Sequence, residues 1–426
     1  MIIRNFKSLS TNSPKQIVLS IIEAGLEAAL PGKQFEKIIH KKHLWMLGKK
    51  INLKKYDKIF IIAIGKAANS MAESVNSLTS ITGGLLVVPK KTKTRLPRNF
   101  KVIQAGHPLP NKNSVVAAKK IIEFLEDITP RDFVIFLISG GASSLVVLPD
   151  GITLREKKIV TGLILNCGAT IQEINCIRKH LSKIKGGRLL RHLRSDGISL
   201  VMSDVVGDDP SAIASGLTYY DKTTFSDARK ILKKYHLENA VPKNVLGHID
   251  LGIQGKIPET PKRQKIKNQI ISTNKLCLDA MNIRAKDHGL STKVLNCMSG
   301  NVKDLGMKLA KKLDDKTINC LIFGGEATVV VKGKGKGGRN QELVLYTAIN
   351  LAKQNKRAIV VSVGTDGVDG KTDSAGAIWI SDQKIDKIMP YLDENNSYKF
   401  FRKYGGLVFT GLTGTNLMDI GLVLRQ

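Results

Sequence analysis

The pattern that most constrains the fold is a repeated succession of a short apolar run, a turn containing glycine, and a helix-forming stretch. Three such runs are KIFIIAIG (58–65), DFVIFLIS (132–139) and RAIVVSVG (357–364). Runs of this length, rich in Ile and Val, are typical of strands buried on both faces of a sheet. Their alternation with helices predicts parallel strands joined by right-handed crossovers, and therefore an α/β fold.

The length of the chain, 426 residues, is too great for one hydrophobic core and predicts two domains. The polar stretch GKIPETPKRQKIK (255–267) contains two prolines and is the best candidate for a linker. We therefore expect two three-layer α/β domains with mainly parallel sheets, a larger Rossmann-like domain over 1–254 and a second domain over 268–426.

The net charge of +31, from 67 Lys and Arg against 36 Asp and Glu, permits two interpretations. Nucleic-acid binding requires clustered cations, preferably with aromatic side chains between them. Here the lysines are spread along the chain and aromatic residues make up only 5%, which favours a lysine-rich solvated surface without a specific nucleic-acid partner.

No apolar run approaches the roughly 20 residues that a membrane span requires, so we expect no membrane partner. The five cysteines are scattered, without a CxxC pair. This spacing argues against a disulfide framework or a zinc site and predicts a cytoplasmic protein.

The residues that could carry chemistry follow the apolar runs directly. In a parallel sheet these turns share the carboxyl edge, where ligands bind. Glycine turns present N–H groups to anions, cations neutralise phosphate oxygens, and carboxylates hold Mg²⁺ or accept a proton, which together suit phosphoryl transfer. The candidates are Lys66, Ser139, Gly140, Gly141, Asp204, Asp208, Asp209, Glu326, Gly337, Gly338, Arg339, Asn340 and Asp366.

Known nucleotide motifs are absent. In GTDGVDGKT (364–372) five residues separate Gly364 from Gly370, where a P-loop requires four. No G-x-G-x-x-G directly follows a predicted strand with a properly spaced acid, so a dinucleotide enzyme is not supported. His107, within AGHPLP, is better interpreted as a structural imidazole in a rigid turn than as a general base.

The stretch VKGKGKGGRNQE (331–342) leads into a predicted helix. We expect the backbone at Gly337 and Gly338, together with Arg339, to bind a phosphate or a carboxylate. Lys332, Lys334 and Lys336 either share this task or belong to a mobile, solvated loop.

Long blocks of the chain resemble the class II glycerate 2-kinases, the family whose C-terminal region is called MOFRL. Two departures from the usual family pattern are SGLTYYD (215–221), where Pro more often follows the Gly, and Ala327, where Thr is frequent. The resembling blocks run in family order from about Ala63 to Ile420 and include AIGKAANSM, AGHPLPN, LISGGASSL, IQEINCIRKHLSKIKGGRLL, MSDVVGDDPSAIASG, FGGEATVVVKGKGKGGRNQE, VGTDGVDGKTDSAGA and TGLTGTNLMDI.

The resemblance implies ATP-dependent phosphorylation of D-glycerate at its 2-hydroxyl, with Mg²⁺ or Mn²⁺, in a cleft between the two domains. Its favoured catalytic pair corresponds to Lys66 and Arg339. Lys66 suits the charge developing on the transferred group, and the planar fork of Arg339 suits a carboxylate or the γ-phosphate. The partners are then D-glycerate and ATP. A homodimer is an open alternative to a monomer.

The acidic residues receive provisional roles. We assign Asp204 and Asp209 to the metal, because Mg²⁺ takes only one or two carboxylates and keeps several waters. Substrate or phosphate binding is assigned to Ser139, Gly140, Gly141, Asp208, Glu326, Gly337, Gly338, Asn340 and Asp366. Glu326 and Asp366 are also alternatives for the metal or for the general base.

Three other functions stay open at this stage. The family has carried the label hydroxypyruvate reductase, which the missing dinucleotide fingerprint argues against. A basic nucleic-acid-binding α/β protein and a non-catalytic regulatory domain are the others, and the intact set of charged residues speaks against the last.

Overall fold

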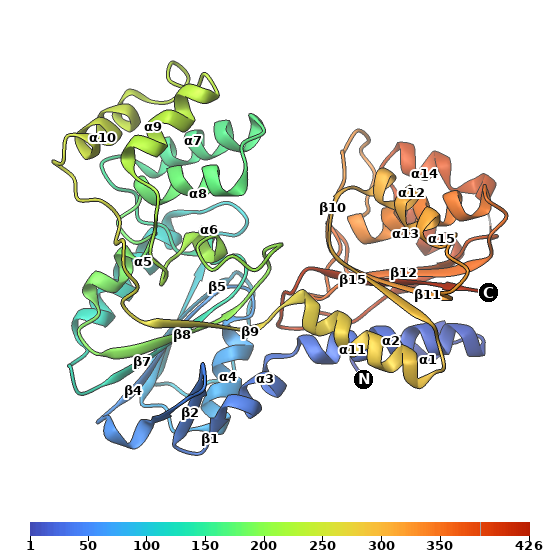
Figure 1. Ribbon diagram of the computed structural model, residues 1–426, viewed down its shortest axis with the longest axis horizontal. Helices are drawn as coiled ribbons and strands as arrows, with labels where there is room; N and C mark the ends of the chain where they lie inside the picture. The colour runs from blue at the N-terminus through green and yellow to red at the C-terminus, as the bar shows by residue number, and fades with distance from the viewer. Residues whose placement is uncertain (384) are drawn as a thin grey trace. The chain divides into compact units, whose positions relative to one another are not determined.

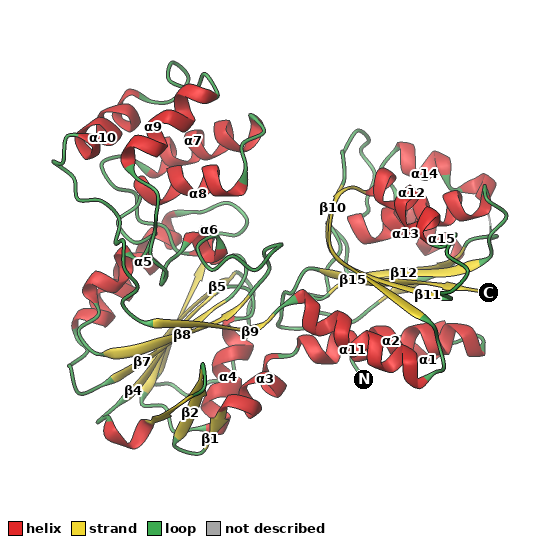
Figure 2. Cartoon of the chain, viewed as in Figure 1, coloured by secondary structure: helices red, strands yellow, loops and turns green. Residues whose placement is uncertain are grey.

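The computed structural model describes residues 1–383 and 385–426 and divides the chain into two compact units. Residues 34–271 form one unit, which we call the inserted unit. Residues 1–33 and 272–426 together form the other, which we call the terminal unit. Figures 1 and 2 show that each unit contains a sheet with helices against it.

The sheet of the inserted unit has the strand order β6-β5-β4-β7-β8-β9. The pairs from β6 to β8 are all parallel, with Ile59 opposite Phe133 at the start of the central pair. The strands are β4 (Ile59–Ile64), β5 (Gly83–Pro89), β6 (Phe100–Ala105), β7 (Phe133–Ile138), β8 (Asp196–Met202) and β9 (Lys267–Ser272). All six residues of β7 are buried, as expected for a strand covered on both faces.

Helices α4 (Ala68–Leu78), α5 (Lys112–Glu126) and α6 (Ala142–Leu145) connect these strands. The buried face of α5 packs on Ile62, Val87 and Phe136 of the sheet. A small antiparallel sheet of β1 (Ile39–His40), β2 (His43–Met46) and β3 (Lys49–Asn52) follows α3 (Pro31–Ile38).

A separate cluster of helices within the inserted unit has its own hydrophobic core. It contains α7 (Leu154–Asn166), α8 (Ile171–His180), α9 (Phe225–Lys234) and α10 (Lys243–Ile253). The helices α7, α8 and α9 each begin at a Thr whose side chain and the third residue of the helix cap one another reciprocally. Phe225 and Leu232 of α9 are fully buried at the centre of this core.

The terminal unit has the strand order β10-β11-β15-β12-β13-β14. Only β10 and β11 pair in parallel, and the other pairs are antiparallel. The strands are β10 (Thr292–Asn301), β11 (Cys320–Thr328), β12 (Ala358–Gly364), β13 (Gly376–Ile380), β14 (Leu407–Val408) and β15 (Asp419–Arg425). The strand β15 lies between β11 and β12 and runs opposite to both.

Helices cover both faces of this sheet (Figure 1). One face carries α2 (Ser13–Ala29) and α11 (Asn274–Asp287), which touch so closely at Gly25 that a Cβ there would lie 2.7 Å from Met281 Cγ. The other face carries α12 (Val302–Lys312), α13 (Arg339–Ala352), α14 (Met389–Asp393) and α15 (Ser397–Tyr404), whose apolar residues pack on Phe323, Val360 and Trp379.

The α/β class and the layered architecture predicted from the sequence are confirmed. Parallel pairing, however, holds for the pairs from β6 to β8 of the inserted unit and, among the strands named above, for the pair β10–β11 of the terminal unit. The chain passes from β11 through α13 to β12, but the last strand of the chain, β15, lies between those two strands. A pattern of local apolar runs does not show which strand from elsewhere fills such a gap.

The division of the chain also differs from the predicted boundaries of 1–254 and 268–426. Residues 255–267 belong to the inserted unit, where Arg188 Nη2 donates to the Pro258 carbonyl at 3.0 Å. The chain leaves this unit after β9, at 271–272, rather than at the proline-containing stretch. The first 33 residues belong to the terminal unit because the apolar face of α2 packs on α11, far along the sequence.

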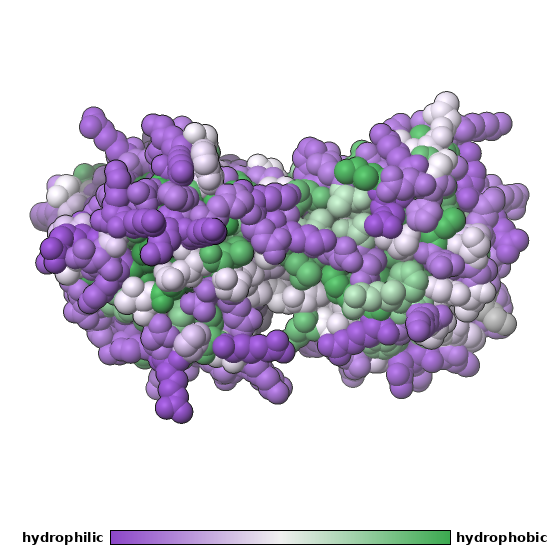
Figure 3. All heavy atoms as spheres, turned by 90° about the horizontal axis from the view of Figure 1, so that it is seen from below, coloured by the Kyte–Doolittle hydropathy of each residue, from purple (hydrophilic) through white to green (hydrophobic). Residues whose placement is uncertain are grey.

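Hydrophilic side chains cover much of the face that Figure 3 shows, with smaller groups of hydrophobic ones between them. Among the residues that the structure describes, no helix is both long enough and apolar enough to cross a membrane.

Candidate active site

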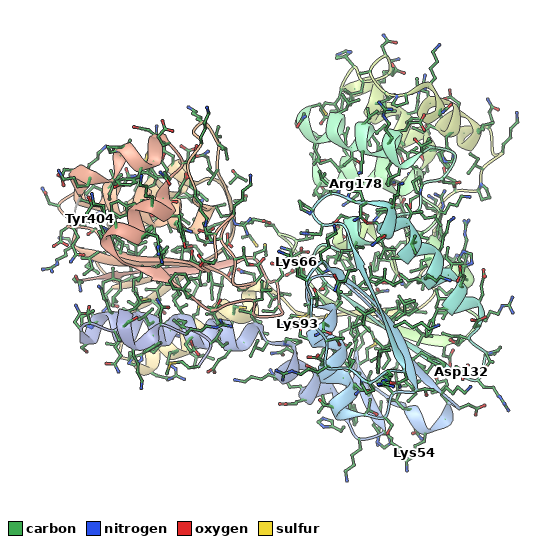
Figure 4. The ribbon with its side chains drawn as sticks, turned by 180° about the vertical axis from the view of Figure 1, so that it is seen from behind. Lys54, Lys66, Lys93, Asp132, Arg178 and Tyr404 are labelled. Atoms are coloured by element: carbon green, nitrogen blue, oxygen red, sulfur yellow. The ribbon has the colours of Figure 1, made fainter. Side chains whose placement is uncertain are left out.

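The turn after β4 carries Lys66 and is fastened to the turn after β7. The Lys66 N–H donates to the Gly140 carbonyl at 2.8 Å, and the Ala67 N–H donates to Ser139 Oγ at 3.1 Å. Gly65 has a φ of +135°, and a Cβ there would lie 2.1 Å from Ser139 Oγ, so glycine is required. Figure 4 shows Lys66 at this end of the strands. The structure thus brings together Lys66, Ser139 and Gly140, as predicted.

Gly141 lies between Lys66 and His107. A Cβ on Gly141 would lie 2.8 Å from His107 Cδ2 and 3.4 Å from Lys66 Cγ. The sequence interpretation treated His107 as a structural residue in a rigid turn. Its ring in fact packs against the same glycine turn as the Lys66 side chain, so it belongs to this cluster.

Asp204, Asp208 and Asp209 follow β8, which pairs with β7 and ends at the same edge of the sheet. Asp209 is engaged by its own loop: one carboxylate oxygen accepts the Ser211 N–H and the other the Ser211 hydroxyl, both at 2.9 Å. Over residues 1–383 and 385–426, no three His, Cys, Asp or Glu side chains are grouped so as to hold a metal ion. The metal roles of Asp204 and Asp209 stay predictions.

A chain of hydrogen bonds, not anticipated from the sequence, links the Lys66 turn to α8. Ser143, two residues beyond Gly141, has its hydroxyl 2.9 Å from that of Ser215. The Ser215 hydroxyl donates to Asn175 Oδ1 of α8 at 3.0 Å. In the sequence, the segment IQEINCIRKHLSKIKGGRLL carried a resemblance to the family but no predicted site residue. In the structure it packs beside the candidate site.

The same segment contains several buried cations. Lys179 and Arg188 have exposed fractions of 4% and 3%. Arg188 Nη1 donates to the carbonyls of Lys179 and Ser182 at 3.1 and 2.8 Å. Burial lowers the pKa of Lys157, of α7, to about 7. The sequence contained a signal for these buried cations, because some of them occupy helix positions where the helical period predicts a buried side chain.

In the terminal unit, Arg339 begins α13 and is held by two carboxylates. Its Nε and Nη2 donate to the two oxygens of Asp419 at 2.6 and 3.0 Å, and Nη1 donates to Glu326 at 2.6 Å. Although burial alone lowers it, Asp419 raises the pKa of Arg339 above its ordinary value. The fork that the sequence analysis offered to a substrate is therefore used by Asp419 in this structure.

Asp419 was missed by the sequence analysis, which considered only residues that follow strands. It is the first residue of β15 and lies opposite Gly325 of β11 and Gly364 of β12. Because β15 is antiparallel to both neighbours, its beginning lies at the edge where theirs end. Asp366 lies at the same edge, since a Cβ on Gly364 would lie 3.2 Å from Asp366 Oδ1 and 3.4 Å from Asp419 Oδ1.

The beginning of α13 is already occupied by a carboxylate of the protein. Asp369, 1% exposed, accepts the N–H groups of Asn340 and Gln341 at 3.0 and 2.9 Å. Burial raises the pKa of Asp369 to about 7, although these two N–H donors act in the opposite direction. A Cβ on Gly338 would lie 2.2 Å from Asp369 Cγ. Gly338 and Asn340 therefore contact the carboxyl group of Asp369 at the position where we had expected a phosphate.

The loop VKGKGKGG (331–338), which we call the Gly-Lys loop, contacts the segment 394–397 at several points. The N–H groups of Lys332 and Gly333 donate to Asn395 Oδ1 at 2.7 and 3.0 Å, and that of Gly335 donates to the Glu394 carbonyl at 2.8 Å. A Cβ on Gly337 would lie 2.2 Å from Ser397 Oγ. These glycines allow close packing of the chain on itself, which disfavours the alternative of a mobile loop.

The predicted site residues therefore form two clusters. Lys66, Ser139, Gly140, Gly141 and the three aspartates after β8 belong to the inserted unit. Glu326, Gly337, Gly338, Arg339, Asn340 and Asp366 belong to the terminal unit.

Two family models match the chain: Domain of unknown function (DUF4147) over residues 17–250 and MOFRL family over residues 319–419. A glycerate 2-kinase of Pyrococcus horikoshii is 38% identical over 397 residues, 88% of this chain and 89% of that protein. A D-glycerate 2-kinase of Thermotoga maritima is 35% identical over 437 residues, 97% of this chain and 99% of the relative. A putative hydroxypyruvate reductase of Agrobacterium vitis is 36% identical over 388 residues, 85% and 86% of the two chains.

The crystal structure of a glycerate kinase from Thermotoga maritima superposes with a TM-score of 0.81 at 34% identity, covering 96% of this chain and 98% of that one. The chain forms two α/β units, and each has charged side chains at one edge of its sheet. Charged side chains at this position are typical of enzymes. The chain belongs to the family in which the DUF4147 domain is followed by a MOFRL domain.

Proposed function

We propose that the protein is a glycerate 2-kinase, which transfers the γ-phosphoryl group of ATP to the 2-hydroxyl of D-glycerate and forms 2-phosphoglycerate and ADP. The observation that carries the proposal is the Lys66 turn, in which two glycine turns at adjacent strand ends hold one lysine beside Ser139. The choice of substrate rests on the relatives, which match nearly the whole chain and are named glycerate 2-kinases.

Lys66 has the properties of a group that stabilises charge in the transition state. Its backbone is fixed by a buried strand and by the bond to Gly140, so its ammonium group needs little reorganisation during the reaction. As the bond from the γ-phosphorus to the ADP oxygen breaks and the bond to the glycerate oxygen forms, Lys66 neutralises the charge on the transferred group.

Arg339 serves as the second cation, oriented by Asp419 and Glu326. The proton of the 2-hydroxyl must pass to a base. Glu326 and Asp366 are both candidates for this base, although Glu326 already pairs with Arg339 and Asp366 Oδ1 already accepts the Val368 N–H. The proposed catalytic pair takes one cation from each unit.

A divalent cation fits the donor set of the inserted unit. The candidates Asp204 and Asp209 offer carboxylate oxygens, which Mg²⁺ and Mn²⁺ prefer, and one or two of them suffice. Such an ion would neutralise the phosphate oxygens of ATP. Asp209 would have to share its oxygens with Ser211.

A direct assay tests the proposal. The purified protein, incubated with D-glycerate, ATP and MgCl₂, should release ADP in a coupled assay, and ³¹P NMR should identify the product as 2-phosphoglycerate. Formation of 3-phosphoglycerate would reject the regiochemistry, and the absence of any phosphorylated glycerate would reject the function.

The alternative of a hydroxypyruvate reductase has a relative of that name but little support in the geometry. The Gly-Lys loop has G-x-G-x-x-G spacing, but a Cβ on Gly333 or Gly335 would clash with Glu394. Glycine is thus explained there by packing rather than by a pyrophosphate. Oxidation of NADH or NADPH by hydroxypyruvate in the presence of the protein would revive this alternative.

We also propose that the protein acts in the cytoplasm. The five cysteines are free thiols, and three of them, Cys176, Cys277 and Cys320, are buried. This arrangement suits a reducing compartment.

A further inference from the structure

The inserted unit contains a hollow of about 290 Å³, and Asp209 is the one lining residue to which a role is proposed above. One wall is formed by Gln172, Asn175 and Lys179 of α8, and the other by residues of the segment 209–223. The hydrogen-bonded chain from Asn175 through Ser215 to Ser143 connects this wall to the Lys66 turn within the same unit.

Lys179 is the most informative residue of this hollow. Its side chain is 4% exposed, and its ammonium nitrogen lies 3.2 Å from Asp221 Oδ1. An ammonium group has three donors, and in the part of the chain that the structure describes Asp221 is the only hydrogen-bond acceptor found for this one. Lys157, by contrast, reaches two carbonyls, those of Arg178 and Leu181. A buried cation with so few acceptors is costly unless a ligand supplies more.

Asp221 cannot easily serve Lys179 further, because its carboxylate is already well supplied with donors. It accepts the N–H and the hydroxyl of Thr223 at 3.2 and 2.9 Å and the hydroxyl of Thr260 at 3.1 Å. The remaining donors of Lys179 are therefore free to receive an anion that enters the hollow.

The other groups around the hollow limit what that anion can be. The charges of Lys179 and Lys222 are offset by those of Asp209 and Asp221, so the hollow has no excess positive charge with which to hold a polyphosphate. A single carboxylate adds only one negative charge and can accept hydrogen bonds from Lys179. The amides of Gln172 and Asn175 can bind hydroxyl groups. The rings of Tyr219 and Tyr220, with centroids 4.8 Å apart, provide an apolar surface for a short carbon chain.

We propose that this hollow is the hydroxy-acid subsite of the enzyme: Lys179 binds the carboxylate of a short 2-hydroxy acid, and the amides on α8 bind its hydroxyl groups. This assignment rests on the proposed function, since it identifies the residues that hold the acceptor. The two tyrosines of the segment SGLTYYD line the subsite.

The first test compares Asp221→Asn with the double variant Lys179→Met/Asp221→Asn. The double variant leaves no unpaired buried charge, so it should fold, but it lacks the cation. Its KM for D-glycerate should rise at least about 30-fold while its KM for ATP changes less than about twofold. Asp221→Asn retains the cation without its internal partner, and its KM for D-glycerate should fall about threefold.

The second test reverses one charge at the rim and does not disturb the core. Lys222→Glu should raise the KM for D-glycerate about fivefold, because the reversed charge repels the carboxylate. Lys256→Glu is the matched control: Lys256 is also exposed, belongs to the same unit and does not line the hollow. It changes the net charge equally and should leave both KM values unaltered.

The outcomes separate this proposal from the proposed function. If the wild-type protein does not phosphorylate D-glycerate, the proposed function fails. If it does, and the double variant and Lys222→Glu both keep the wild-type KM for D-glycerate, the subsite is wrong. Calorimetric titration with ADP provides the remaining distinction: a loss of ADP affinity in these variants, with glycerate binding intact, would assign the hollow to the nucleotide and overturn the proposal.

Discussion

The replacement Asp419→Asn tests whether Arg339 is positioned by the carboxylate at the beginning of β15. In the structure Asp419 accepts two hydrogen bonds from one edge of the guanidinium group, at 2.6 and 3.0 Å, and its side chain is only 7% exposed. Asparagine has nearly the same shape, but it is neutral and offers one acceptor in place of two. Arg339 would keep Glu326 as its only anionic partner in direct contact.

The expected change in the free energy of unfolding is the difference between two opposing contributions. Two unit charges about 4 Å apart attract by roughly 4 kcal/mol at an effective dielectric constant of 20. The lost attraction is partly offset, because a neutral amide at position 419 avoids the free-energy cost of burying a charged carboxylate. Since Glu326 remains, we expect a loss of about 2 kcal/mol in the free energy of unfolding. If the same energy positions Arg339 in the transition state, kcat/KM should fall about 30-fold.

Urea denaturation and steady-state kinetics measure the two effects separately. Asp382→Asn is the matched control, because Asp382 pairs with Arg357 at 3.0 Å in the same unit while both side chains are largely exposed. The control should cost less than about 0.5 kcal/mol and should not change kcat/KM. If Asp419→Asn is as harmless as the control in both assays, the positioning role of Asp419 is refuted.

Four other predictions follow from the same structure. Lys66→Ala should lower kcat by about 10²-fold or more, with the KM for glycerate within a few-fold and the unfolding temperature unchanged; near-normal turnover would assign Lys66 to a solvated surface. Asp369 has a folded-state pKa raised to about 7 from an ordinary value of 3.8, so the folded state favours its proton, and its contribution to stability should decline as the pH rises from about 4 to 7. Asp369→Asn should flatten this decline in urea titrations, and an unaltered slope would contradict the raised pKa. Excess EDTA should abolish activity and Mg²⁺ or Mn²⁺ should restore it, whereas full activity in EDTA would exclude the metal. Small-angle scattering should show a smaller radius of gyration when an ATP analogue and glycerate are added together, and no change would argue against a cleft between the units.

Local sequence patterns predicted the residues at strand ends well, since a buried strand followed by a glycine turn leaves few conformations for the next residues. Lys66 and Ser139 are the clearest example, because both follow runs of Ile, Val and Leu whose parallel pairing places the two turns side by side. Lys66 lies in the inserted unit and Arg339 in the terminal unit.

Contacts between distant segments could not be predicted in this way. Asp419 precedes a strand instead of following one, and only the antiparallel insertion of β15 brings it to the active edge. Asp369 stands 30 residues beyond Arg339 in the sequence, yet it fills the position at the beginning of α13 that resembled a vacant phosphate site. In both cases the carboxylate is placed by a contact between two distant segments, and the periodicity of a single segment gives no information about such a contact.

The division of the terminal unit into two pieces of sequence has a consequence for the synthesis of the protein. Helix α2 leaves the ribosome among the first residues, but α11 and β15, on which its apolar face packs, come after the inserted unit of residues 34–271. At roughly 5–20 residues per second, that face waits on the order of ten to fifty seconds for its partners. During this interval it is a ready target for chaperones or for another nascent chain. A circular permutant that begins at Ser272 and joins the old termini would shorten the wait, and it should aggregate less during expression.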